Sequence, residues 1–260
     1  MQDSLRALVA EALGTALLIA IVVGAGLHAQ RMAPDDAVIA LGVSAVAGAA
    51  GLAALLVAFG GISGGHLNPV VSLSAFVRGA LPPAQALRYV AAQTGGAVLG
   101  VAAIHLMYGE PALAASLRPR TGLAQWASEA FATFGLIGIG MATARVRPAM
   151  VPAAVSCWLG AGCWFTASSA YANPALTLAC ALTAAPCGMR VADVPGFVLA
   201  QCAGALAGTL LFHWLLKGRP SSEPSSQSSA QPSRKPDGSS VLLRADGAVD
   251  AQRQQRAERP

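Results

Sequence analysis

Long apolar runs alternate with short polar connections over the first 217 residues of the chain. Six of these runs contain about 20 residues each, which is the length of helix that crosses the hydrocarbon core of a bilayer. We therefore predict six membrane-spanning helices, over residues 5–28, 37–59, 84–108, 122–144, 148–165 and 194–216. Residues 218–260 are rich in Ser, Pro and Gln and cannot bury a core, so they are predicted to form a disordered cytoplasmic tail.

Two shorter segments interrupt the apolar pattern with an Asn-Pro pair, GGHLNPVVSLSAF at residues 64–76 and SSAYANPALTLAC at residues 168–180. Asn is a good helix cap and Pro is tolerated in the first helical turn, so each pair predicts a helix start. Helices over residues 68–79 and 173–184 would each be roughly 18 Å long, enough for half of the bilayer. Each segment is therefore predicted to be a loop that dips to mid-membrane and returns as a half-helix.

The two halves of the apolar region repeat each other in the same order. AEALGTALLIA at residues 10–20 resembles SEAFATFGLIG at 128–138, and QTGGAVLG at 93–100 resembles QCAGALAG at 201–208. The corresponding residues lie 118 apart for Glu11 and Glu129, and 105 apart for Asn68 and Asn173. Three spans per half require the second half to enter from the opposite side, which gives an inverted repeat.

The predicted fold class is therefore an all-α membrane protein, with six transmembrane helices and two re-entrant half-helices in an inverted repeat. Its single domain covers residues 1–217, with one repeat over about 5–108 and the other over about 122–217.

Composition and charge agree with a membrane protein. The chain is 55% hydrophobic and 11% charged, whereas soluble domains carry about 25% charged residues. The net charge is +5, but the basic residues lie in loops and in the tail, so nucleic acid is not a predicted partner.

The basic residues also predict the orientation in the membrane. With the N-terminus inside, seven of them face inward and four outward, which favours cytoplasmic termini in the plasma (inner) membrane. The inner residues are Arg6, Arg78, Arg88, Arg145, Arg147, Lys217 and Arg219, and the outer ones are Arg31, Arg118, Arg120 and Arg190.

The half-helix starts carry the candidate chemistry. Their positive dipole ends and the amides of Asn68 and Asn173 would meet near the midplane, where they repel cations and offer donors to a neutral solute. This predicts a passive channel.

The sequence shows neither a nucleophile-base set nor a phosphate-binding glycine loop, so an enzyme is not predicted. The five cysteines lack metal-site spacing, so neither a metal nor a cofactor is predicted. A soft-metal contact at Cys163 is a minor alternative.

The paired Asn-Pro boxes, the AE..GT and SEAFAT starts, and the Gln-initiated third spans resemble the major intrinsic protein family, the aquaporins and aquaglyceroporins. The resemblance implies a homotetramer with one pore per subunit and no cofactor. It also implies that Glu11 and Glu129 brace the re-entrant loops from inside. His66 would line the pore, or its ring would be satisfied by loop packing. The implied pore motifs are Asn68, Pro69 and Val70, where the family usually has Ala in third place, and Asn173, Pro174 and Ala175.

The family's outer selectivity filter can be located by counting from the two motifs. The four positions fall on Gly48, Ala161, Ala170 and Leu176, all small or apolar, and Leu176 stands where an arginine is expected. Arginine would supply a fixed charge and a fork of donors, so its absence predicts a wider, apolar filter. Cation exclusion would then rest mainly on the half-helix dipoles.

The missing arginine, together with Thr177 in place of the Asp of glycerol-specific members, is similar to bacterial homologues linked to metalloid transport. The expected solutes are small and neutral: arsenite or methylated arsenic, glycerol-like molecules and some water. An ordinary water or glycerol channel is the main alternative. A secondary transporter, which shares inverted repeats and broken helices, and a structural membrane protein are the others.

Overall fold

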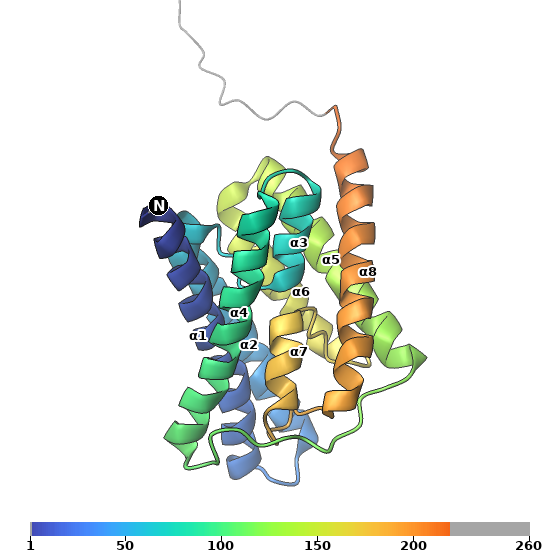
Figure 1. Cartoon of the computed structure of the whole chain (residues 1–260). Helices are drawn as coiled ribbons and strands as arrows, with labels where there is room; N and C mark the ends of the chain where they lie inside the picture. The colour runs from blue at the N-terminus through green and yellow to red at the C-terminus, as the bar shows by residue number, and fades with distance from the viewer. Residues whose placement is uncertain (1, 219–260) are drawn as a thin grey trace, which may run out of the picture. The chain divides into compact units, whose positions relative to one another are not determined.

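The computed structural model describes the backbone of residues 2–218 and the side chains of residues 4–218. The predicted tail lies outside the described residues apart from Gly218. The described part contains eight α-helices and two short 3-10 turns (Figure 1). The helices are α1 (Gln2–Met32), α2 (Ala37–Ser63), α3 (Pro69–Val77), α4 (Pro83–Tyr108), α5 (Leu123–Val146), α6 (Val151–Phe165), α7 (Pro174–Ala181) and α8 (Val194–Leu215).

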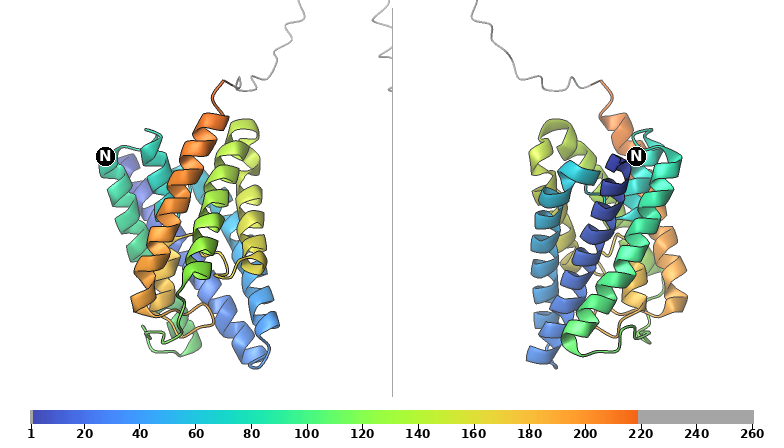
Figure 2. Two further views of the ribbon diagram at one scale, coloured as in Figure 1. Left: turned by 90° about the vertical axis from the view of Figure 1, so that its right-hand side faces the viewer. Right: turned by 60° about the vertical axis from the view of Figure 1, so that its left-hand side comes forward.

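Six of the helices in the described part of the chain are long and apolar enough to cross a membrane, which confirms the predicted number of spans. The predicted ends hold to within a few residues, except that α1 continues to Met32 and α2 to Ser63. The six lie side by side as a bundle (Figure 2). We call the end of the bundle where α1 begins and α8 ends the N-terminal end, and the opposite end the distal end.

The inverted repeat appears directly in the packing. Helix α1 packs on α2 and α4, and α5 packs in the same way on α6 and α8. A Cβ atom added at Gly96 would lie 2.2 Å from the carbonyl oxygen of Ala12, and one added at Gly204 would lie 2.1 Å from that of Ala130. Glycine therefore lets the two backbones touch at equivalent crossings in each half, as is common between helices in membranes.

The two half-helices enter from opposite ends and meet in the middle of the bundle (Figure 1). Each is capped as predicted: the Oδ1 atom of Asn68 accepts from the N–H of Val70 at 3.0 Å, and that of Asn173 from the N–H of Ala175 at 2.9 Å. Helix α3 runs from the centre to the N-terminal end and α7 to the distal end, so the positive ends of both dipoles point to the centre.

Candidate functional site

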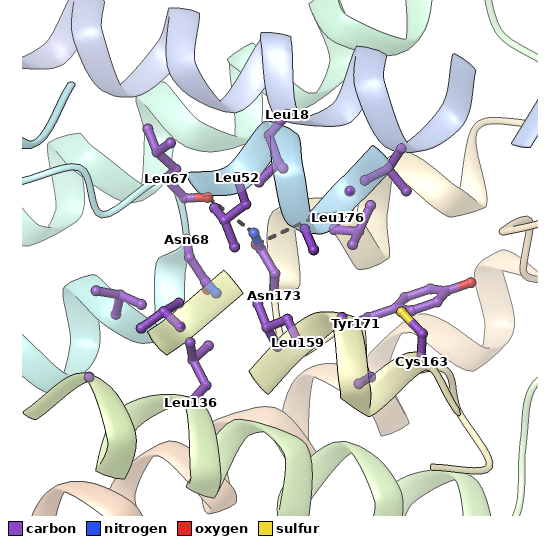
Figure 3. A pocket seen from close by; sticks show the side chains of 18 of the residues that line it. Leu18, Leu52, Leu67, Asn68, Leu136, Leu159, Cys163, Tyr171, Asn173 and Leu176 are labelled. Atoms are coloured by element: carbon purple, nitrogen blue, oxygen red, sulfur yellow. Dashed lines mark hydrogen bonds between the residues drawn. The ribbon is translucent and has the colours of Figure 1, made fainter. Parts of the chain in front are cut away.

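A cavity of about 1290 Å³ passes the point where the two half-helices meet, and both Asn68 and Asn173 line it. It reaches Arg118, Arg120 and Cys187 at the distal end, and Arg145 and Lys217 at the N-terminal end. Figure 3 shows its centre, where leucines surround the two asparagine side chains. An apolar wall with a few polar groups is the usual design of a small-molecule site. The leucines in its lining are Leu18, Leu41, Leu52, Leu56, Leu67, Leu136, Leu159, Leu176 and Leu216.

The two asparagines join the re-entrant loops to each other. The Nδ2 atom of Asn68 donates to the carbonyl of Ala172 at 2.8 Å. That of Asn173 donates to the carbonyl of Leu67 at 3.0 Å (Figure 3). Both side chains are buried, at 6% and 4% exposure. Each amide carries two N–H donors, so this reciprocal pair occupies one donor of each asparagine. The sequence placed the asparagines at the centre but did not indicate that they lock the two loops together.

Glu11, on α1, supports the re-entrant loop between α2 and α3. Its carboxylate accepts the backbone N–H groups of His66 at 2.9 Å and Leu67 at 2.7 Å. The side chains of Ser63 and Gln93 donate to it at 2.5 and 2.7 Å. A fully buried carboxylate is tolerated in a membrane when its oxygens are hydrogen-bonded in this way.

Glu129 supports the second loop with equivalent contacts. It accepts the backbone N–H groups of Tyr171 at 2.9 Å and Ala172 at 2.8 Å, and Gln201 donates to it at 2.6 Å. Ser168 makes the contact that corresponds to Ser63 in the first half. These contacts are those expected of the bracing role that the sequence predicts for both glutamates.

His66 borders the cavity and is also held by its neighbours. Its Nδ1 atom lies 3.0 Å from the hydroxyl of Ser72, and its ring meets the ring of Tyr89 edge to face at 5.3 Å between centroids. The two alternatives for this residue, a pore-lining ring and a ring satisfied by packing, therefore describe the same side chain.

Three of the four counted filter positions border the cavity, namely Gly48, Ala170 and Leu176. The fourth does not: Ala161 is exposed on the outer surface of α6, and Gly160 and Cys163 line the cavity instead. Successive helical residues are rotated by about 100°, so a count that slips by one or two residues points to the wrong face of the helix. The structure thus corrects Ala161 and brings Cys163 to the wall.

Sequence reasoning also missed the arginines of the connection between α4 and α5, residues 109–122. It treated Arg118 and Arg120 only as charges on a loop, whereas both border the distal mouth of the cavity. The carbonyls that their guanidinium groups contact are 48 to 68 residues away in the chain, so no local pattern indicates these contacts. Within the described residues, no group of three or more His, Cys, Asp or Glu side chains is arranged to hold a metal ion.

The family model described as major intrinsic protein matches residues 1–161 and 142–241, two overlapping stretches. The chain is 44% identical over 215 residues to aquaglyceroporin AqpS of Rhizobium meliloti (strain 1021), covering 83% of this chain and 92% of that protein. It is 29% identical over 224 residues to human aquaporin-2, covering 81% and 79%.

A solved structure shares the fold. The aquaglyceroporin from Plasmodium falciparum matches with a TM-score of 0.63, covering 80% of this chain and 95% of that chain at 16% sequence identity. The predicted fold class, an all-helical aquaporin-like membrane protein, is thereby confirmed.

Proposed function

Because the chain belongs to the major intrinsic protein family, whose members are channels and not enzymes, we propose that it is a wide, passive channel for uncharged solutes larger than water. Glycerol-like polyols and neutral arsenic hydroxides such as arsenous acid are the proposed solutes. Arsenous acid has three hydroxyl groups and so resembles a small polyol in its hydrogen bonding. Family membership also favours a channel over the secondary transporter that the sequence left open.

The observation that carries this proposal is the combination of residues around the distal half of the cavity. Gly48, Ala170 and Gly160 add almost no side-chain volume, and Leu176 adds neither charge nor donors. A solute there meets an apolar wall, and the donors nearest the centre are the two asparagine amides. Such a wall narrows the path little, so it admits uncharged solutes larger than water, and the amides of Asn68 and Asn173 offer hydrogen bonds to their hydroxyl groups.

The membrane arrangement belongs to the same proposal. We place the N-terminal end in the cytoplasm and the distal end outside, in the plasma (inner) membrane, since the basic loop residues favour that orientation. The homotetramer that the family resemblance implies stays a prediction.

The test is stopped-flow light scattering on proteoliposomes that contain the full chain, with water, glycerol and arsenite as permeants. We expect glycerol and arsenite to enter at rates well above those of empty liposomes. Leu176→Arg should lower the glycerol rate by about tenfold, because the longer charged side chain narrows the filter. Leu176→Met conserves volume and adds no charge, so it should keep the wild-type ratio of glycerol to water.

Two results would contradict the proposal. One is a channel that passes water faster than every larger solute and takes up no arsenite. The other is a Leu176→Arg variant with the wild-type solute profile, which would mean that Leu176 is not at the constriction.

A further inference from the structure

Arg120 reaches from the connection between α4 and α5 to the rim of the cavity, close to the filter. Each nitrogen of its guanidinium donates to a backbone carbonyl: Nε to Gly188 at 3.3 Å, Nη1 to Ser168 at 3.2 Å and Nη2 to Pro186 at 3.4 Å. Ser168 precedes the second half-helix and the other two follow it. The guanidinium therefore bridges the two loops on either side of α7, where the distal mouth opens.

Two further contacts, besides the three backbone carbonyls, fix the position of Arg120. The guanidinium carbon lies over the ring of Tyr171, 5.1 Å from its centroid, which is cation–π geometry. The backbone N–H of Arg120 donates to Asp193 at 2.8 Å. Tyr171 directly follows Ala170, one of the filter positions. A cation is thus held rigidly beside the filter in spite of Leu176.

No direct ion pair within the described residues balances the positive charge of Arg120. Among residues 4–218, whose side chains the structure describes, no carboxylate forms an ion pair with Arg120: Asp193 pairs with Arg190 and Glu110 with Arg31. Two acidic residues do line the same mouth, Asp35 and Asp36, and Asp36 accepts the N–H groups of Val38 and Ile39 at the start of α2. Three of the five guanidinium N–H donors are used by the carbonyls, which leaves two.

We propose that Arg120 supplies, from a different segment of the chain, the cation that is absent at Leu176. Its charge excludes cations at the distal mouth, where the cavity passes the guanidinium. Because its stem rises from the α4–α5 connection and not from α7, it leaves the filter wide. The inference rests on the proposed function and changes one expectation from the sequence: cation exclusion is shared between the half-helix dipoles and Arg120.

The competing explanation is that Arg120 only ties loops together. Arg118 offers a matched control, since its guanidinium also donates to the carbonyl of Pro186, whereas the hydrogen bond to Ser168 and the cation–π contact with Tyr171 belong to Arg120. A loss that came from a loosened distal loop would appear in both arginine variants. A loss that came from charge at the filter would be larger in the variant that removes the charge of Arg120.

The experiment measures two quantities on proteoliposomes of the full chain. Glycerol uptake reports the proposed function, and proton and potassium leak under a diffusion potential reports the charge barrier. Arg120→Gln should raise the cation leak roughly tenfold, since one charge within about 10 Å of the path changes cation occupancy by that order at an effective dielectric constant near 20. Its glycerol uptake should stay within twofold of wild type. Arg120→Lys should keep the barrier, and Arg118→Gln, at a residue exposed to solvent, should raise the leak less than Arg120→Gln does.

A double variant separates charge from loop structure. In Arg120→Gln/Leu176→Arg, an arginine at the family position should return the leak to the wild-type level while glycerol uptake falls. An unchanged leak in Arg120→Gln, an equal rise in Arg118→Gln, or no rescue by the second arginine would each overturn the inference. A wild-type channel that passes no glycerol would instead overturn the proposed function, because the leak measurement does not depend on solute uptake.

If Arg120→Gln does not fold, Arg120→Lys decides the question. A folded lysine variant with the wild-type barrier supports the charge, because lysine cannot reproduce the three-carbonyl fork. A folded lysine variant with a raised leak contradicts it.

Discussion

The two re-entrant segments have the same backbone but reach it with different residues. Left-handed φ angles occur at Gly64, Gly65 and Leu67 in the first, and at the residues 105 positions later in the second, Ser169, Ala170 and Ala172. Glycine adopts this conformation without cost, whereas other L-residues lose about 1–2 kcal/mol each. The first segment therefore has one strained residue where the second has three.

Their side chains also differ where the backbones agree. His66 contacts Ser72 and Tyr89 on the N-terminal side of the centre. Its counterpart Tyr171 packs against Phe197 at 5.7 Å between ring centroids and carries Arg120 on its face. The duplication thus preserves the scaffold of glutamate, glutamine and asparagine, and the difference between the mouths comes from the residues around it. Strain gathers in the second segment, next to the filter, as is common at functional sites.

The largest effect should come from removing the brace of the strained segment. Glu129→Ala leaves the N–H groups of Tyr171 and Ala172 and the amide of Gln201 without their acceptor in a buried site. At about 1–3 kcal/mol for each unsatisfied group, the loss should exceed about 3 kcal/mol. We expect a large drop in Tm in detergent and little folded protein.

Glu11→Ala is the matched variant in the first half, where it removes the acceptor of His66, Leu67 and Gln93. It should also destabilise the protein, but less, because the glycines keep the first loop near its preferred conformation without help. An equal or larger loss of Tm in Glu11→Ala would break the comparison, since strain in the second segment would then have no consequence.

An intermediate effect is expected at the helix crossings that position the two segments. Gly204→Ala and Gly96→Ala each force a methyl group against a backbone carbonyl, of Ala130 and Ala12 respectively. Overpacking of this kind costs about 1–3 kcal/mol. Because the scaffold is symmetric, both should lower Tm by similar amounts. Gly95→Ala serves as the control, since nothing lies within 4 Å of the added carbon. A clearly different loss of Tm in the two variants would contradict the expectation that the two crossings are energetically equivalent.

The smallest effect tests the strain itself. Ser169→Gly should raise stability by about 1 kcal/mol, because it relieves a left-handed residue. Gly64→Ser should lower it by a similar amount, although the added carbon meets only ordinary contacts with the His66 ring at 3.4 Å. Thermal unfolding of both variants in the same detergent measures the pair. If the two shifts have the same sign, backbone strain does not distinguish the segments.

Much of the scaffold follows from the sequence because its signals are local or repeated. Apolar runs of bilayer length fix the six spans, and the Asn-Pro pairs fix the half-helix starts through capping. The repeat singled out Glu11 and Glu129, whose hydrogen bonds to the loops are those that bracing requires. An apolar environment leaves a carboxylate few alternatives to nearby backbone donors, so its partners can be inferred from its position.

Only the tertiary structure decided which side chains form the pore wall and its mouths. The sequence identified Leu176 as a missing charge, but the rotation of α6 that replaces Ala161 with Gly160 and Cys163 depends on packing against the other helices. The placement of Arg120 depends on contacts with residues up to 73 positions away in the chain. Apolar runs and helix caps depend on residues close together in the chain, so they can be predicted from the local sequence. Helix rotation and loop docking arise from contacts between distant segments, and these exist only once the chain has folded.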